Sequence, residues 1–163
     1  MPMAGALVWT VVGMLGLVLP ERTAIYALLF ATGGIFPVAI GIAALKGEQL
    51  LSNNNPLAKL MGACVFMVNL LWAIHIPLLL RAPTLVPLSV AIGLGLHWVV
   101  YSWITRHSIG YQHAVIRTVG ALVAWWMFPG NVVTACATAV VLAYGYAIYV
   151  MATRRIHQLD SLR

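Results

Sequence analysis

Long apolar runs separated by short polar turns constrain this chain more than any other feature of its sequence. Six runs approach the roughly 20 residues that a helix needs to cross the hydrocarbon core of a bilayer. They are Ala4–Leu19, Thr23–Leu45, Leu57–Leu80, Leu85–Thr105, Ala114–Phe128 and Val132–Met151. The pattern predicts an all-α membrane protein, a compact bundle of six transmembrane helices that forms one domain over residues 1–163.

The composition supports a surface that faces lipid rather than water. Only 7% of the residues are charged, whereas soluble domains carry about 25%. Nine Lys and Arg against three Asp and Glu give a formal net charge of +6. The basic residues punctuate the apolar runs and form no patch, so we expect the lipid bilayer, and not nucleic acid, as the partner of this chain.

The basic residues also predict an orientation, because cytoplasmic connections carry an excess of Lys and Arg. Numbered in order, the odd connections hold only Arg22 and Arg81. The even connections and the C-terminus hold Lys46, Lys59, Arg106, Arg117, Arg154, Arg155 and Arg163. This distribution predicts that both termini are cytoplasmic.

The fourth run carries a stripe of small and polar residues. Ser89, Gly93, His97, Tyr101 and Thr105 recur at intervals of four, and a row at that interval follows one side of a helix. Polar side chains are costly in hydrocarbon, so the stripe should face the interior of the bundle. His97, about 20 Å deep at 1.5 Å of rise per residue, is the centre of this prediction.

A polar partner for His97 is expected on the neighbouring run. The short connection at Arg81 makes runs three and four antiparallel neighbours, and Asn69 would lie about 18 Å deep on run three. Pro37 should kink run two beside this pair. The sequence therefore predicts a ligand-binding site at the midplane, formed by His97, Tyr101, Ser102, Asn69, Trp103 and Pro37. The alternative is a purely structural hydrogen bond between helices.

A second polar group is expected near the outer surface. His75 would lie about 9 Å below that surface, on the same side as Glu21, Arg22 and Arg81. Together these four residues form a second candidate site for an anionic or protonatable ligand. The alternative is a set of headgroup-level side chains, in which Arg81 extends to the interface.

The segment "GLHWVVYSW", Gly95 to Trp103, resembles the Gly-x-His-x-x-x-Tyr-Ser-Trp core of an uncharacterised family of small bacterial six-helix integral membrane proteins. The resemblance extends over "NNNPLAKL" and "SIGY", roughly Pro37 to Tyr111. It implies a multi-pass protein of the bacterial inner membrane, with His97, Tyr101, Ser102 and Trp103 at the centre. Family members often have proline where this chain has Val100, so a less sharply bent fourth span is expected.

Four functions stay open at this point. The favoured one is binding or transport of a small or lipophilic ligand by a homodimer, since six short spans are few for a monomeric transporter. The second is a membrane-embedded enzyme with His97 as general acid or base. The third is haem ligation by His75 and His97, although their depths differ by about 10 Å. The fourth is a structural or regulatory subunit. No metal site or cofactor is predicted, because the runs lack carboxylates and a His-x-x-x-His motif.

Overall fold

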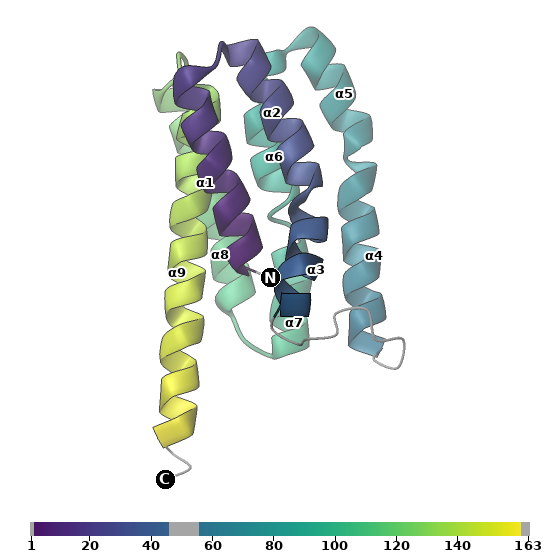
Figure 1. Ribbon diagram of the computed structural model, residues 1–163, viewed down its shortest axis with the longest axis vertical. Coiled ribbons are helices and arrows are strands. Elements are labelled where there is room, and N and C mark those ends of the chain that lie inside the picture. The colour runs from purple at the N-terminus through teal and green to yellow at the C-terminus, as the bar shows by residue number, and fades with distance from the viewer. Residues whose placement is uncertain (1, 46–55, 161–163) are drawn as a thin grey trace.

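The computed structural model describes residues 2–45 and 56–160, and every regular element in these ranges is a helix (Figure 1). The elements are α1 (Pro2–Val18), α2 (Glu21–Gly33), α3 (Ile35–Leu45), α4 (Pro56–Leu70), α5 (Trp72–Arg81), the 3₁₀ turn η1 (Pro83–Leu85), α6 (Val86–Gly93), α7 (His97–Thr105), α8 (Ile109–Met127) and α9 (Val132–Asp160). The predicted all-α class is thereby confirmed for the described residues.

The helices form one bundle in which α9 packs on both α1 and α8 (Figure 1). α6 lies against α8 and α9, and α7 lies against α8. α4 and α5 stand at the edge, where α4 contacts α7 and α5 contacts α6. Runs three and four are therefore neighbours, as the short connection at Arg81 predicts. The first residues of α1 and the last residues of α9 point towards the same end of the bundle (Figure 1).

Three helices among the described residues are long and apolar enough to cross a membrane: Gly62–Arg81, Pro83–Thr105 and Val132–Arg154. A bent pair, Glu21–Gly33 with Ile35–Ile42, brings the number to four if it counts as one span. α1 is a shorter apolar helix of 17 residues. These helices indicate a membrane protein, and they match four of the six predicted runs.

The fifth predicted run differs most from the helix that the structure forms. α8 begins at Ile109, five residues before the predicted start at Ala114, and so takes in polar residues that were assigned to a connection. Arg117 lies inside the predicted run, although the charge distribution counts it with the cytoplasmic residues. The structure buries it in the middle of α8, with no exposed surface. Without it, the predicted cytoplasmic connections hold six basic residues rather than seven.

The outside of the bundle is apolar, as a lipid-facing surface requires. Large exposed hydrophobic side chains occur on every long helix; the most exposed are Leu45, Phe30, Trp126, Val18, Leu80, Leu17 and Leu142. The core is built from smaller residues around Trp9, with several alanines of α9 fully buried. The polar residues of the core are few and are described below.

Glycines set the closest approach between helices. A methyl group on Gly5 would collide with the ring of Tyr144, so α1 and α9 meet at this point. A methyl group on Gly110 would collide with the carbonyl oxygen of Trp98 and with Ser102, so α7 and α8 meet there. Small residues at such crossings let the helix backbones pack directly, which drives helix association in lipid.

The two irregularities of the bundle lie in runs two and four. The second run bends by 44° between Gly33 and Ile35, just before Pro37, whose ring and missing N–H disturb the preceding turn. In the fourth run, the N–H groups of Gly95 and Leu96 bond to residues three positions back, Ile92 and Gly93. The tightened turn at residues 94–96 separates α6 from α7, although Val100 replaces the proline of the resemblance.

Candidate functional site

The tightened turn in run four creates a free backbone acceptor inside the bundle. In a continuous α-helix the N–H of Gly95 would bond to the carbonyl of Ala91, but it bonds to Ile92 instead, over 2.8 Å. The freed oxygen of Ala91 accepts the Nε–H of Arg117 over 2.6 Å. A methyl group on Gly95 would lie 3.2 Å from Cδ of Arg117. Glycine at this position therefore gives the arginine its space.

Arg117 is fully buried and has few partners. Its Nη1 donates to the hydroxyl of Tyr144 over 3.3 Å, and its guanidinium carbon lies 5.1 Å from the ring centre of Trp9 and 5.6 Å from that of Tyr144. Such contacts are cation–π interactions. Nη2 has no partner. The arginine is thus held by a carbonyl, a phenol and two aromatic faces.

No carboxylate pairs with Arg117 within the described part of the chain. The sequence contains three acidic residues. Glu21 is exposed at the start of α2, and the side chains of Glu48 and Asp160 lie outside the description. A charged side chain at the centre of a bilayer costs about 2.5–3.5 kcal/mol even by the most lenient scale. The positive charge of Arg117 therefore lacks a protein counter-ion among the residues described.

His113 lies one turn before Arg117 on the same face of α8 and is also fully buried. Its ring stacks on Trp98, with centroids 3.9 Å apart, and lies 4.8 Å from the ring of Tyr144. Its Nδ1 lies 3.1 Å from the carbonyl oxygen of Ala143. A carbonyl only accepts, so Nδ1 carries the proton and Nε2 of the neutral ring is a bare acceptor. That Nε2 has no partner.

We call Trp9, Trp98, His113, Arg117 and Tyr144 the inner cluster. They come from α1, α7, α8 and α9, and contacts through Tyr144 and Arg117 join all five. Among the described residues, four buried polar side-chain atoms lack a hydrogen-bond partner: Nε1 of Trp9, Nε1 of Trp98, Nε2 of His113 and Nη2 of Arg117. All four belong to the inner cluster, where unpaired polar atoms are expensive.

Two residues of the predicted midplane site, His97 and Tyr101, lie beside the inner cluster, and the other four predicted residues do not. His97 begins α7, is half-buried, and is close enough to Arg117 and His113 to interact electrostatically with both. Tyr101 stacks edge-on against Trp98 with centroids 5.3 Å apart, and its hydroxyl donates to Sδ of Met151. Both residues thus border the cluster.

The other predicted members lie elsewhere. Asn69 is exposed on α4, where its amide donates to the carbonyl of Val65 over 2.8 Å, and no hydrogen bond among the described residues joins it to His97. Trp103 is 66% exposed, and Pro37 is exposed near the start of α3. The rotation of each helix about its axis decides these positions, and periodicity alone does not fix it.

Ser102 has a structural partner. Its Oγ accepts the N–H of Tyr111 over 2.8 Å, which is one of the unpaired donors of the first turn of α8. Gly110 permits the close approach, and His107 accepts the N–H of Ile109 over 3.0 Å. The "YSW" and "SIGY" segments of the resemblance therefore meet as one joint between α7 and α8.

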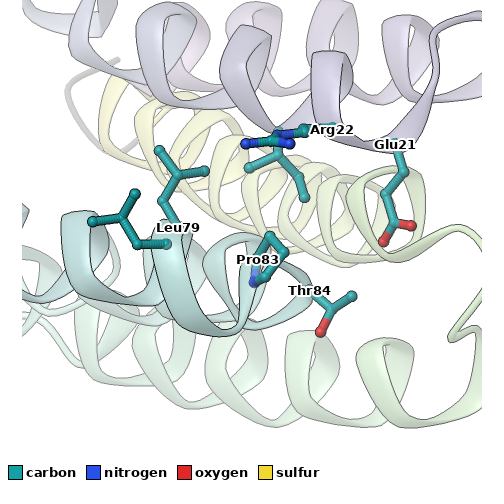
Figure 2. A pocket seen from close by; sticks show the side chains of 7 residues that line it. Glu21, Arg22, Leu79, Pro83 and Thr84 are labelled. Atoms are coloured by element: carbon teal, nitrogen blue, oxygen red, sulfur yellow. The ribbon is translucent and has the colours of Figure 1, made fainter.

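The second candidate site is split in the structure. Glu21 and Arg22 line an open pocket of about 230 Å³ with Leu79, Pro83 and Thr84 (Figure 2). Arg81 is exposed and is not part of that lining. His75 is buried between α5 and α6, where its Nδ1 lies 3.1 Å from Oγ of Ser89 and its ring meets Trp72 edge-on.

Neither region offers a metal site. Within residues 2–45 and 56–160, no group of three His, Cys, Asp or Glu side chains could hold a metal ion. Cys64 and Cys136 are both free and buried. Haem ligation by His75 and His97 gains no support, because His75 is engaged with Ser89 at the interface of α5 and α6.

A family model for a family of unknown function (DUF7010) matches residues 1–154. The chain belongs to this family. The comparison with curated proteins and the comparison with solved structures each give no match. The resemblance inferred from "GLHWVVYSW" to an uncharacterised family is thereby confirmed. For a DUF7010 chain, any function has to be argued from the site itself.

None of the five residues of the inner cluster, Trp9, Trp98, His113, Arg117 and Tyr144, is among the site residues that the sequence predicts. A signal for two of them was present. Gly110, His113, Arg117 and Ala121 recur at intervals of three or four, the same kind of stripe that singled out His97. It was overlooked because Arg117 was counted with the cytoplasmic residues.

Proposed function

We propose that this protein is a multi-pass protein of the bacterial inner membrane that binds or transports a small ligand inside its helical bundle. The proposed site is the inner cluster, with His97 and Tyr101 at its border. One observation carries the proposal: the four unpartnered buried polar atoms of the described residues gather in this one cluster. Buried polar groups in native proteins are almost always paired, so a concentration of atoms without a protein partner favours a bound ligand as their partner.

The chemistry of the cluster also supports a ligand over a structural role. A structural arginine in a membrane bundle is normally neutralised by a carboxylate or capped by several carbonyls. Arg117 has one carbonyl and one phenol. The aromatic rings around Arg117 are apolar and exclude water. Ligand sites are commonly lined by such side chains together with a few polar groups.

For the topology we propose six spans with both termini in the cytoplasm. The remaining two spans are α1 and α8. α1 packs along α9, and α8 is 19 residues long. Six basic residues remain on the proposed cytoplasmic side against Arg22 and Arg81 on the other, which still follows the positive-inside rule. Reporter fusions at the two termini test this topology, and an outward location of either terminus would contradict it.

The ligand proposal is tested by native mass spectrometry on protein gently extracted from its membrane. Trp9→Phe and Trp98→Phe each remove one unpaired indole donor but keep an aromatic ring. A ligand mass that accompanies the wild type and is reduced in both variants is the expected result. Trp125→Phe is the matched control, because the indole of Trp125 already donates to the carbonyl of Thr84 over 2.9 Å.

The contradicting result is equally specific. Trp→Phe also removes buried ring atoms, so both variants lose some packing energy whether or not a ligand is bound, and their melting temperatures do not decide the question. If the wild type carries no ligand mass, the ligand proposal is contradicted and the role of the cluster is structural.

We also propose that the protein is a homodimer in the membrane. Asn69 is an exposed amide on a face of α4 with Phe66, Met67 and Leu70. Amides that face lipid are unfavourable, whereas amides between transmembrane helices form hydrogen bonds. A second copy against α4 would give Asn69 such a partner.

A further inference from the structure

The unpaired atoms of the inner cluster have a definite hydrogen-bonding character. The indole nitrogens of Trp9 and Trp98 can only donate, and so can Nη2 of Arg117. The fourth atom, Nε2 of His113, can only accept while the ring is neutral, because Nδ1 holds the proton that faces Ala143. An occupant that satisfies the cluster therefore accepts from three donors and donates to one acceptor.

The net charge of the cluster narrows the class of ligand further. Arg117 contributes one positive charge, and no described carboxylate offsets it. A monovalent anion would neutralise that charge and accept from the three donors. An anion alone, however, would leave Nε2 of His113 without a donor. A proton bound at Nε2 turns that atom into the fourth donor.

The spacing of the cluster limits the size of the ligand. Ring-to-ring and guanidinium-to-ring distances around Tyr144 and Trp98 run from 3.9 to 5.8 Å. Glycines at positions 5 and 95 already bring backbone against Tyr144 and Arg117. These are packing distances, so the cluster excludes a lipid or a sugar and limits an occupant to a few heavy atoms.

We propose that the inner cluster takes up a small monovalent oxyanion together with one proton, with formate-sized carboxylates as the chemical class. The inference rests on the proposed function, whose ligand it specifies. Arg117 and the two indoles hold the anion. The proton comes from solvent and adds to Nε2 of His113, so that anion and proton enter as a neutral pair and no covalent bond of the anion changes. The neutral pair avoids moving net charge into the bilayer interior.

The groups that face His113 fit this assignment. On its own helix the nearest charge is Arg117, from α7 come His97 and the stacked ring of Trp98, and from α9 comes Tyr144. The positive charge of Arg117 opposes protonation of His113 in the empty site. A bound anion reverses this effect by cancelling the charge. Proton uptake is thereby coupled to anion binding.

The experiment measures binding and proton uptake together on the purified full-length protein in detergent. Sodium formate is titrated in while Trp fluorescence reports occupancy, because two of the reporting indoles belong to the site. A pH indicator in weakly buffered solution at about pH 7 counts protons, with about one proton per bound formate expected for the single acceptor at His113. Formamide, a neutral molecule of similar shape, is the matched ligand control.

Two conservative variants separate the two halves of the proposal. His113→Asn keeps an amide donor near the position of Nδ1, so the bond to Ala143 survives while Nε2 is lost. Formate binding should then take up no proton. Arg117→Lys keeps the charge but loses the guanidinium donors, and formate affinity should fall about tenfold or more. His107→Asn, in the turn between α7 and α8, is the control for both and should behave as the wild type.

The outcomes distinguish this inference from the proposed function. Formate that binds without proton uptake, or with the same uptake in His113→Asn, overturns the coupling. Formamide that binds as tightly as formate overturns the anion assignment, while the ligand site itself stands. If neither compound binds but a different mass accompanies the extracted protein, the proposed function survives and the ligand class is wrong. If nothing binds and nothing accompanies the protein, both fail.

Discussion

The Nε–H of Arg117 donates to the carbonyl oxygen of Ala91 over 2.6 Å, across 26 residues of sequence. That oxygen is free because the turn at residues 94–96 has shifted the N–H of Gly95 to Ile92. A short stretch of tight winding inside one span thus anchors a charged residue of another. Tight winding within a helix often marks a functional position. Here it frees the backbone carbonyl that accepts a hydrogen bond from Arg117 of the inner cluster.

Tyr144→Phe should destabilise the protein. The phenol of Tyr144 is the one side-chain acceptor that Arg117 has among the described residues, and its removal leaves a second buried guanidinium nitrogen unpaired. The expected loss is about 1–3 kcal/mol in the free energy of unfolding, measured by thermal or denaturant unfolding in detergent. Tyr146→Phe is the control, because the hydroxyl of Tyr146 donates to an exposed partner, Gln112. Equal losses in the two variants would refute a special role for Tyr144.

Gly110→Ala should loosen the joint between α7 and α8. The added methyl group would collide with the carbonyl oxygen of Trp98 and with Oγ of Ser102, and overpacking of this kind costs about 1–3 kcal/mol. Gly145→Ala on α9 is the control. Its methyl group meets nothing within 4 Å, and alanine is the better helix former by about 1 kcal/mol. The melting temperature should fall for the first variant and hold or rise for the second.

Ser102→Ala should lower stability while leaving ligand binding intact. Its hydroxyl accepts the N–H of Tyr111 at the start of α8, and the loss of such a cap costs about 0.5–2 kcal/mol. Ser108→Ala serves for comparison, since Oγ of Ser108 accepts from the exposed side-chain amide of Gln112 over a longer distance, 3.4 Å. A Ser102→Ala protein with wild-type stability that no longer binds its ligand would restore Ser102 to the binding site.

Asn69→Leu should weaken the proposed dimer. The substitution removes an amide from the exposed face of α4 and leaves the apolar surface around it, so about 0.6–2 kcal/mol of association free energy should be lost. Thr138→Val on α9 is the comparison, because Thr138 is exposed and bonds back to the carbonyl of Thr134 within its own helix. Single-molecule photobleaching in liposomes across a range of protein densities measures the dimer fraction. An unchanged fraction in Asn69→Leu places the interface elsewhere.

The apolar runs predicted the helices well, because the length and hydropathy of a run are local properties. The bend before Pro37 and the neighbouring placement of runs three and four followed from proline geometry and a short connection. The inner cluster could not be found in this way. The Ala91 carbonyl that accepts from Arg117 is free only because the helix is wound more tightly at residues 94–96, and the sequence does not predict that winding.

The predicted midplane site also shows that the sequence does not determine how each helix is rotated about its axis. His97 lies half-buried beside Arg117 and His113, and a four-residue stripe does indicate which residues share a face of a helix. Asn69 is exposed on α4, because the rotation of a helix about its axis follows from packing and not from the counting of residues. α4 has little packing to fix that rotation.

The span formed by α4 and α5 is the least buried of the three long spans. Only 11% of the residues in the window of Gly62–Arg81 are buried, against 39% in each of the other two long spans. It contacts α7 through α4 and α6 through α5, where His75 and Ser89 are hydrogen-bonded. Segments with little buried surface open at the lowest free energy. This span is therefore the part of the described bundle that we expect to separate from its neighbours at the lowest free-energy cost, while α1, α8 and α9 stay packed together.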